Sequence, residues 1–222
     1  MRILYHIPLS PACRKIRLIL AEKRLPFELM TEKVWEKREE FLKFNPVGTV
    51  PVLVEENGLA IPESYAISEY LEEAYPDTSL LGRTLGERVE VRRLVSWMEG
   101  VFSQEVTDKL LGEKYMKRFL RKGNPDGTAI RQGYTALYFY LEYLGWLAEM
   151  RIWLAGSFFS QADLTAAAYL SSLDFIGDID WSRIPAVKEW YARVKCRPCF
   201  RSLLQDRISG ITPPIHYADL DF

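Results

Sequence analysis

Short apolar runs and amphipathic segments alternate along the first third of the chain, which is the pattern of a mixed α/β unit. By their spacing, strands are predicted at residues 2–6 and 27–30, and helices at residues 13–23, 35–43 and 65–75. Before the last of these helices, the runs VPVLVE and LAIPE flank Asn57-Gly58, which predicts a hairpin closed by a type I′ turn. The predicted order over residues 1–78 is therefore β-α-β-α-β-β-α.

After a linker at residues 79–86, apolar residues recur only at helical spacing. Helices are predicted at residues 87–121, 130–150, 163–176, 185–195 and 198–207. Ser160 and Asp163 have the S-x-x-D spacing of a capping box before the third of these helices, and we interpret them as structural residues. Residues 211–222 contain adjacent prolines and predict an irregular tail. The predicted fold class is thus α/β followed by all-α, with the helical domain over residues 87–210.

Composition narrows the class of protein without naming its chemistry. Of the 222 residues, 48% are hydrophobic and 27% are charged, which is typical of a globular protein with a real core. The 29 basic and 30 acidic residues argue against a protein built mainly to bind nucleic acid. No run approaches the roughly 18 apolar residues of a membrane span, and the N-terminal apolar run is too short for a secretory signal. We therefore expect a cytoplasmic protein without membrane insertion, and the two histidines predict no His-rich metal site.

The near-neutral balance hides an uneven distribution of charge. Residues 1–80 contain 10 basic and 13 acidic residues, whereas residues 109–131 contain seven basic and two acidic ones. Within that second stretch lies a basic run without an acidic residue, formed by Lys114, Lys117, Arg118, Arg121 and Lys122. Such a run is either a solvated helix face or a docking patch for an acidic partner.

Ser10 stands where a predicted helix follows a predicted strand. A hydroxyl residue before Pro11 is a favourable helix start. The free backbone N–H groups and the helix dipole at that point favour an anion, so the Ser10 hydroxyl could stabilise a bound thiolate. The alternative is that Ser10 is only a helix cap.

Two further positions could hold a peptide-like ligand. Val50-Pro51 begins a predicted strand, and a cis bond there would leave the Val50 backbone free for the ligand; the alternative is an edge-strand proline. Glu63-Ser64 precedes the helix at residues 65–75. Free N–H groups and the Ser64 hydroxyl would hold a carboxylate there, while Glu63 would face an ammonium. The alternative is that Ser64 is only an N-cap.

Cys196 and Cys199 match the C-x-x-C pattern of a redox pair. They follow a predicted helix rather than the first strand of a βαβ unit. We therefore interpret them as two small residues at a helix junction.

Taken together, these motifs resemble the cytosolic glutathione S-transferase superfamily. The matching stretches are LYHIPLSPACRKIRLILAEK, FNPVGTVPVL, IPESYAISEYLEEAYP, WLAGSFFSQADLTAAAYL and RPCFRSLL, which span nearly the whole chain. The resemblance implies a thioredoxin-like, glutathione-binding domain at residues 1–78, an all-helical domain after it, and a homodimer.

The resemblance also implies roles for individual residues. Ser10 matches the serine that activates the glutathione sulfur, and Tyr5 is the fallback hydroxyl. Cys13 lies three residues beyond Ser10 and cannot simply replace it. The implied reaction is attack of the glutathione thiolate on an electrophile held near residues 97–102 and Tyr115; the favoured alternative is that these aromatic residues belong to the core. The residues implied to contact glutathione, with Pro51 as the structural cis-proline, are Val50, Glu63, Ser64 and Lys43.

The end of the chain carries a second resemblance. RPCFRSLLQDRISGITPPIHYADLDF looks like the tail of alphaproteobacterial GST-like cell-division factors, which bind filaments of the acidic, tubulin-like protein FtsZ. It implies that the basic run at residues 114–122, together with Asp219 and Asp221, contacts that partner. The alternative is that the tail packs over the domain through Ile215, Tyr217, Leu220 and Phe222. Two functions therefore stay open: a glutathione transferase and a non-enzymatic FtsZ-binding protein.

Overall fold

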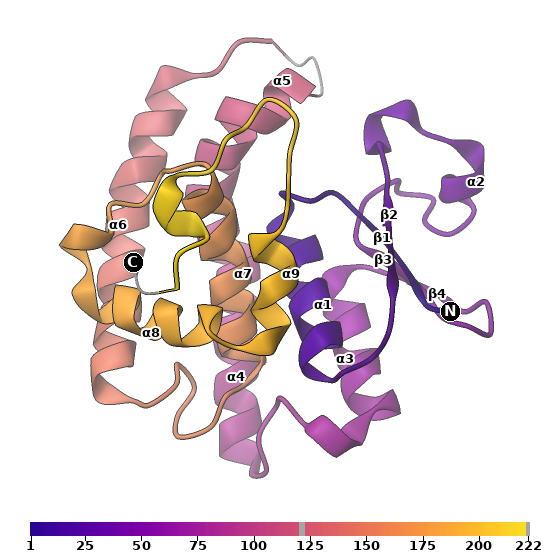
Figure 1. Cartoon of the computed structure of the whole chain (residues 1–222), viewed down its shortest axis with the longest axis horizontal. Helices are drawn as coiled ribbons and strands as arrows, with labels where there is room; N and C mark the ends of the chain where they lie inside the picture. Colours follow the sequence, from indigo (N-terminus) through magenta and orange to yellow (C-terminus); the bar gives the residue numbers. More distant parts are fainter. Residues whose placement is uncertain (120–122, 221–222) are drawn as a thin grey trace.

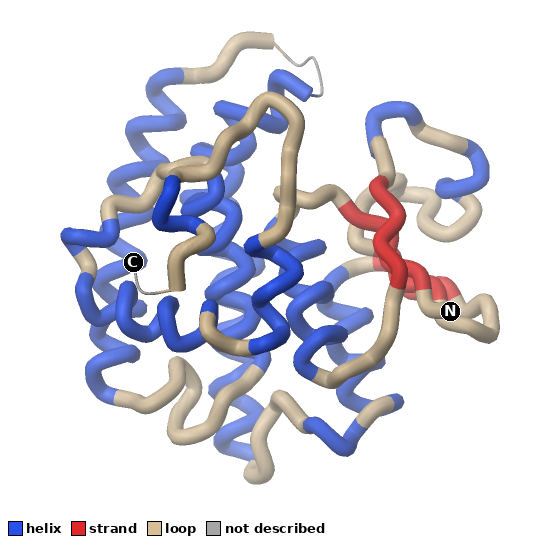
Figure 2. Tube along the Cα trace, viewed as in Figure 1, coloured by secondary structure: helices blue, strands red, loops and turns tan. Residues whose placement is uncertain are grey.

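The computed structural model describes residues 1–119 and 123–220. Its first unit is a four-stranded mixed sheet in the order β2-β1-β3-β4 (Figures 1 and 2). The strands are β1 (Ile3–His6), β2 (Glu28–Thr31), β3 (Val52–Val54) and β4 (Ala60–Pro62). β1 pairs in parallel with β2 and antiparallel with β3, and β3 pairs antiparallel with β4. This is the thioredoxin-like arrangement that the resemblance implies.

Helices cover both faces of this sheet. The helices of the first unit are α1 (Pro11–Glu22), α2 (Glu39–Leu42) and α3 (Ser64–Ala74), with short 3₁₀ turns η1 (Val34–Glu36) and η2 (Pro76–Thr78). α1 and α3 lie between the sheet and the second unit, whereas α2 lies on the other side (Figure 1). The single helix predicted over residues 35–43 is thus a 3₁₀ turn and a short α-helix, separated by Lys37 at a positive φ of 47°.

The β3–β4 hairpin is present, but its turn is not type I′. The Gly58 N–H donates to the Glu55 carbonyl at 2.9 Å, and Gly58 has a φ of 86°. A type I′ turn needs positive φ at both central residues. Asn57 is not among the residues with positive φ, and its side-chain oxygen instead accepts the Leu59 N–H at 3.0 Å. The prediction of the hairpin is confirmed and that of its turn type is wrong.

In the described part of the second unit, the elements are helices joined by loops, without a strand. Its longer helices are α4 (Leu85–Trp97), η3 (Met98–Met116), α6 (Gly127–Met150), α7 (Gln161–Phe175) and α8 (Pro185–Lys195). Its shorter ones are α5 (Lys117–Phe119), η4 (Trp181–Arg183), η5 (Pro198–Phe200), α9 (Arg201–Leu204) and η6 (Ile215–Tyr217). η3 has the wider turns of a π-helix. The spacing of apolar residues predicts a helix here but not its type, because that spacing reflects which residues are buried and not which backbone groups are hydrogen-bonded.

α7 forms the centre of this unit, because every one of its residues is buried. It begins with the predicted capping box: the Ser160 hydroxyl accepts from the helix backbone, and the Asp163 carboxylate accepts the Ser160 N–H at 3.0 Å. Burial raises the pKa of the Asp163 carboxyl. The same carboxylate accepts the Trp190 indole N–H at 2.9 Å, which ties α7 to α8.

The C-terminal tail has one buried aromatic side chain and one fully exposed apolar side chain. The Tyr217 side chain is 1% exposed, whereas Ile215 is 97% exposed. The Lys195 ammonium at the end of α8 donates to the carbonyls of His216 and Asp219, at 3.1 and 2.6 Å. The tail therefore lies against the helical unit as a clamped turn (yellow in Figure 1). Phe222 and Asp221, which the sequence also singled out, lie outside the described residues.

Candidate functional site

Ser10 caps α1 at the point where the chain leaves β1. Its hydroxyl oxygen accepts the Cys13 N–H at 3.4 Å, and Pro11 occupies the first helical position. Ser10 itself is only partly buried, so its hydroxyl lies at an accessible helix N-terminus. Cys13 is fully buried, and burial raises the pKa of its thiol to about 11. Cys13 is therefore a protonated core residue and not a nucleophile.

Tyr5 packs away from this helix start. Its ring centroid lies 5.5 Å from that of Phe41 and 5.5 Å from that of Phe44. Both phenylalanines belong to α2 and the segment directly after it. The ring thus helps to hold α2 on the sheet, whereas Ser10 begins α1.

The backbone before Pro51 is open to a peptide-like ligand. The Val50–Pro51 peptide bond is cis. Within residues 1–119 and 123–220, no hydrogen bond involves the N–H or C=O of Val50. A backbone donor and acceptor side by side can pair with the main chain of a peptide, as an added strand does. Lys43, the other predicted contact on this side, is an exposed residue at the end of α2.

Glu63 is held in an unusual conformation directly before α3. Its φ is 70°, a region that costs a non-glycine residue of order 1–3 kcal/mol and often marks a ligand site. The Thr49 hydroxyl donates to the Glu63 carboxylate at 3.1 Å. Glu63 thus faces the same loop that carries Val50, and the structure brings these two predicted contacts together.

Ser64 does not serve as the N-cap of α3. Glu63 holds the N-cap position without a side-chain cap bond, and Ser64 is the first helical residue. The Ser64 hydroxyl instead donates to the Glu99 carboxylate at 2.7 Å. The same carboxylate oxygen accepts the Lys15 ammonium at 3.1 Å. Neither Lys15 nor Glu99 was found from the sequence, because the contact joins residues that are far apart in the chain.

A cavity of about 320 Å³ lies beside the loop that leads to Ser10. Its walls are mostly apolar and come from the β1–α1 loop, the segment after β2, the end of η3 and the segment after α9; they include Ile7, Trp35, Met116, Phe119 and Ile208. The sequence placed the electrophile near residues 97–102 and Tyr115. Phe102 is fully buried and packs on Trp97 and Tyr140, so the first of these stretches belongs to the core.

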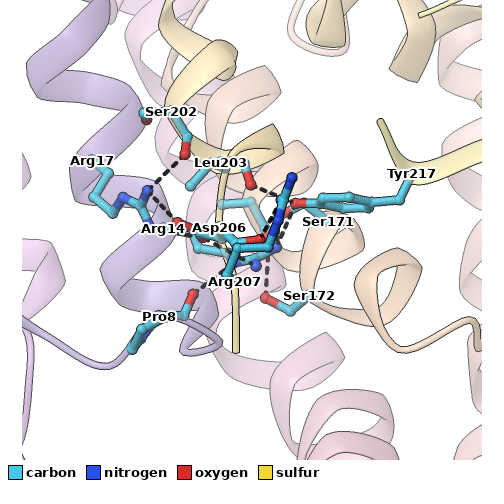
Figure 3. A network of polar contacts seen from close by, with 11 residues as sticks. Pro8, Arg14, Arg17, Ser171, Ser172, Ser202, Leu203, Asp206, Arg207 and Tyr217 are labelled. Carbon is cyan, nitrogen blue, oxygen red and sulfur yellow. Dashed lines mark hydrogen bonds and ion pairs between the residues drawn. The ribbon is translucent and has the colours of Figure 1, made fainter. Parts of the chain in front are cut away.

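A buried polar network reaches Pro8, which also lines this cavity (Figure 3). Arg14 is fully buried, and its guanidinium donates to the Pro8 carbonyl at 2.8 Å, the Ser171 hydroxyl at 3.0 Å and the Tyr217 hydroxyl at 3.1 Å. Arg17 forms two hydrogen bonds of 2.8 Å with the Asp206 carboxylate. The network joins the loop before Ser10 to α7 and to the tail.

The basic run is largely engaged within the molecule where the structure describes it. The Lys114 ammonium forms a 2.6 Å ion pair with Asp178, and the Lys117 ammonium a 2.6 Å ion pair with Glu113. Arg118 belongs to α5, but its side chain lies outside the described part of the chain, as do Arg121 and Lys122.

The C-x-x-C pair does not have the environment of a redox centre. Cys196 is exposed at the end of α8, whereas Cys199 is buried in η5, and both are free thiols. Burial, together with the neighbouring Glu22, raises the pKa of the Cys199 thiol. A thiol that resists ionisation is a poor partner in thiol–disulfide exchange.

Among the residues that the structure describes, no group of three or more histidine, cysteine or acidic side chains is placed to hold a metal ion. No helix in residues 1–119 or 123–220 combines the length and the apolar character that a bilayer crossing needs.

Comparison with known proteins decides the family. The model of the glutathione S-transferase N-terminal domain matches residues 4–79. The chain is 49% identical to FtsZ-localized protein A of Caulobacter vibrioides over 224 aligned residues, which cover 100% of this chain and 98% of the relative. A crystal structure of a glutathione S-transferase from Rhodospirillum rubrum F11 is 53% identical, with a TM-score of 0.97 over 100% of both chains.

The chain belongs to the glutathione S-transferase superfamily. Within this superfamily, the structure of FzlA from C. crescentus is also 49% identical, with a TM-score of 0.96 over 100% of this chain and 99% of the other. Glutathione S-transferases are typically dimeric and bind glutathione, and one relative of this chain carries FtsZ in its name.

Proposed function

We propose that this superfamily member is a cell-division protein that binds FtsZ filaments in the cytoplasm at the division site. The observation that carries the proposal is the extent of its similarity to FtsZ-localized protein A, which runs through both units and the tail rather than through the first unit alone. We expect a homodimer, as is typical of the superfamily.

The fixed shape of the tail supports a role in binding another protein. Tyr217 is buried, and Lys195 binds the His216 and Asp219 carbonyls of the turn, while Ile215 directly before them is 97% exposed. An apolar side chain that is held in the open by a braced turn loses little conformational entropy on binding. Asp219 lies on the same turn, and Asp221 follows it.

Only some residues of the basic run are proposed to bind the acidic filament. Lys114 and Lys117 have carboxylate partners inside the molecule. We therefore assign the contact with FtsZ to Arg118, Arg121 and Lys122. Cationic side chains of this kind speed and orient the encounter with an acidic partner.

Co-sedimentation with FtsZ polymer tests this proposal. Wild type should pellet with polymer, and charge reversal at Arg118 and Arg121 should greatly reduce the pelleted fraction. The control reverses two charges elsewhere, at Arg83 and Arg88, which are exposed at the start of α4. Wild type that stays in the supernatant would refute FtsZ binding, and an unchanged charge-reversal variant would refute the basic-run contact.

A second function, glutathione-dependent transfer to a small electrophile, is favoured by the open Val50 backbone and by Ser10 at the helix start. Val50 would pair with the cysteinyl main chain, while Glu63 and Ser64 would meet the γ-glutamyl end and Lys43 the glycine carboxylate. The Ser10 hydroxyl would donate to the thiolate, which the α1 dipole also stabilises. The apolar cavity would hold the electrophile.

Glutathione calorimetry and conjugation of a chloro-nitroaromatic test this second function. Binding accompanied by turnover that disappears in Ser10→Ala would support it. Turnover that is unchanged in Ser10→Ala would refute the role of the serine, and absence of binding at millimolar glutathione would refute the transferase.

A further inference from the structure

The cavity beside the β1–α1 loop has room and apolar surface for a small aromatic molecule. Its volume of about 320 Å³ is that of a compact ligand site. The Trp35 and Phe119 side chains line it and are 42% and 40% exposed, so both rings keep surface that a ligand can cover. Met116 and Ile208 complete the apolar wall. A flat ring placed here exchanges water for contacts with two aromatic rings, a thioether and an aliphatic chain.

The wall of this cavity carries an unbalanced positive charge. Within residues 1–119 and 123–220, the charged side chains that line it are those of Glu32 and Arg207. Glu32 is 1% exposed, and both of its carboxylate oxygens accept from the Arg38 guanidinium, which neutralises it. Arg207 is exposed, and its Nη1 donates to the backbone carbonyl of Asp206 at 3.0 Å. Arg207 forms no ion pair with a carboxylate in the part of the chain that the structure describes.

The Asp206 carboxylate, one residue before Arg207, is already used by other cations. It accepts two hydrogen bonds of 2.8 Å from Arg17 and one of 3.4 Å from Arg14 (Figure 3). Two buried guanidiniums therefore share one carboxylate directly behind the wall, which leaves this side of the cavity positive. A ligand with one acid group supplies the negative charge that Arg207 lacks.

We propose that the cavity binds an amphipathic organic anion, with an aromatic body of about naphthalene size against the apolar wall and a carboxylate on Arg207. A guanidinium and a carboxylate form a charge-assisted hydrogen bond with defined geometry, so Arg207 is the specificity-determining residue of the cavity. The inference rests on the second function only in taking this cavity as the place of the electrophile. It narrows that electrophile to molecules that carry an acid group, and binding of such a molecule needs no glutathione.

Calorimetry with two matched probes, in the absence of glutathione, tests the proposal. The probes are 2-naphthoate and 2-naphthamide, which have the same ring system and similar shape but differ in charge. Wild type should bind 2-naphthoate about ten-fold more tightly than 2-naphthamide, because a charge-assisted hydrogen bond is stronger than a neutral one.

Three variants locate the two ends of the probe. Arg207→Met keeps an unbranched side chain without the charge, so the affinity for 2-naphthoate should fall about ten-fold and that for 2-naphthamide should not change. Arg201→Met is the matched control, since Arg201 is an exposed arginine of α9 outside the cavity wall, and it should change neither affinity. Trp35→Ala removes a partly exposed ring of the wall and should weaken both probes by the same factor.

Three results would overturn the proposal. They are equal affinity of wild type for the two probes, an unchanged affinity of Arg207→Met for 2-naphthoate, and no binding of either probe at millimolar concentration. The second function is tested separately by glutathione binding and by turnover in Ser10→Ala. A protein that binds 2-naphthoate but not glutathione would refute the transferase alone, and one that binds glutathione but not 2-naphthoate would refute this inference alone.

Discussion

Among single residues, Asp163 is a buried acceptor of several hydrogen bonds. Its carboxylate accepts the Leu154 N–H at 2.9 Å, the Ser160 N–H and hydroxyl, and the Trp190 indole at 2.9 Å. The side chain is fully buried. Both carboxylate oxygens accept here, two bonds each, whereas an amide has only one accepting oxygen.

Asp163→Asn should therefore destabilise the protein by about 2–4 kcal/mol, because the amide nitrogen would face donors in a buried site. Chemical denaturation measures the change. Asp77→Asn, at an exposed position, is the control and should be nearly neutral. A neutral Asp163→Asn would show that the buried carboxyl is not needed as an acceptor of several bonds.

His6 predicts a pH dependence of stability. Burial, with help from Arg17, lowers its pKa from 6.5 to about 4 in the folded state. The unfolded chain then binds more protons than the folded one between these values, so stability falls as pH drops through this window. At pH 5 the loss attributable to His6 is about 2 kcal/mol relative to pH 7.

Denaturation of wild type and His6→Gln at pH 7 and pH 5 measures the contribution of His6 to the pH dependence of the free energy of unfolding. The variant should lose less stability than wild type between the two pH values. Equal losses in the two proteins would mean that His6 does not titrate below its ordinary value.

At the scale of elements, α1 does more than close the first unit. Its buried cations, Arg14, Lys15 and Arg17, all reach partners in the second unit. Asp206 neutralises two of them from the segment after α9. The interface between the units is therefore polar and paired as well as apolar.

Asp206→Asn should destabilise the protein by about 3–5 kcal/mol, since it leaves buried guanidiniums without their counter-charge. Glu149→Gln, on the exposed face of α6, is a matched change of charge and should have little effect. Thermal melting of both variants measures the difference. A small shift for Asp206→Asn would mean that water, not Asp206, compensates these cations.

Tyr217→Phe tests how the tail is held. The variant keeps the ring that packs 5.0 Å from Phe175 but loses hydroxyl contacts with Arg14 at 3.1 Å and the Leu203 carbonyl at 3.2 Å. Each such bond contributes about 1 kcal/mol. Hydrogen exchange at the amides of residues 215–219 should become faster, while the amides of α7 should not change.

Local sequence patterns predicted the helices and strands well, but they did not predict contacts between elements that are distant in the sequence. The helix over residues 185–195 and the capping box at Ser160 follow from spacing alone, and both are confirmed. The turn at Gly58 differs because two turn types accept the same Asn-Gly pair. The Ser64–Glu99 contact, and the wall of the cavity that the segment after α9 forms, depend on tertiary packing, which no local pattern encodes.

For the whole molecule, the uneven charge of the sequence is partly cancelled by folding. The Lys114 ammonium donates to Asp178 and to the Tyr134 hydroxyl, both at 2.6 Å, and that hydroxyl donates to Asp178 at 2.9 Å. Hydrogen bonds to these partners, against the opposing effect of burial, leave the pKa of Lys114 raised. A count of basic residues therefore overstates the charge that a partner meets.

Lys117→Met should accordingly leave FtsZ pelleting unchanged, whereas Lys114→Met should lower the melting temperature. Loss of Lys114 strands the buried Asp178 carboxylate, at a cost of about 2–4 kcal/mol. Pelleting and melting are measured on the same two proteins. A loss of pelleting in Lys117→Met would place that residue back in the contact with the filament.

The Arg14 network also constrains the order in which the chain can fold as it is synthesised. The Arg14 guanidinium needs Ser171, Tyr217 and the Pro8 carbonyl to be satisfied. Residue 14 leaves the ribosome long before residues 171 and 217 exist. The face of α1 that carries Arg14 therefore stays in contact with water until almost all of the second unit has emerged, because these later partners belong to that unit. The native contacts of this helix, which begins directly after Ser10, are consequently completed late in synthesis.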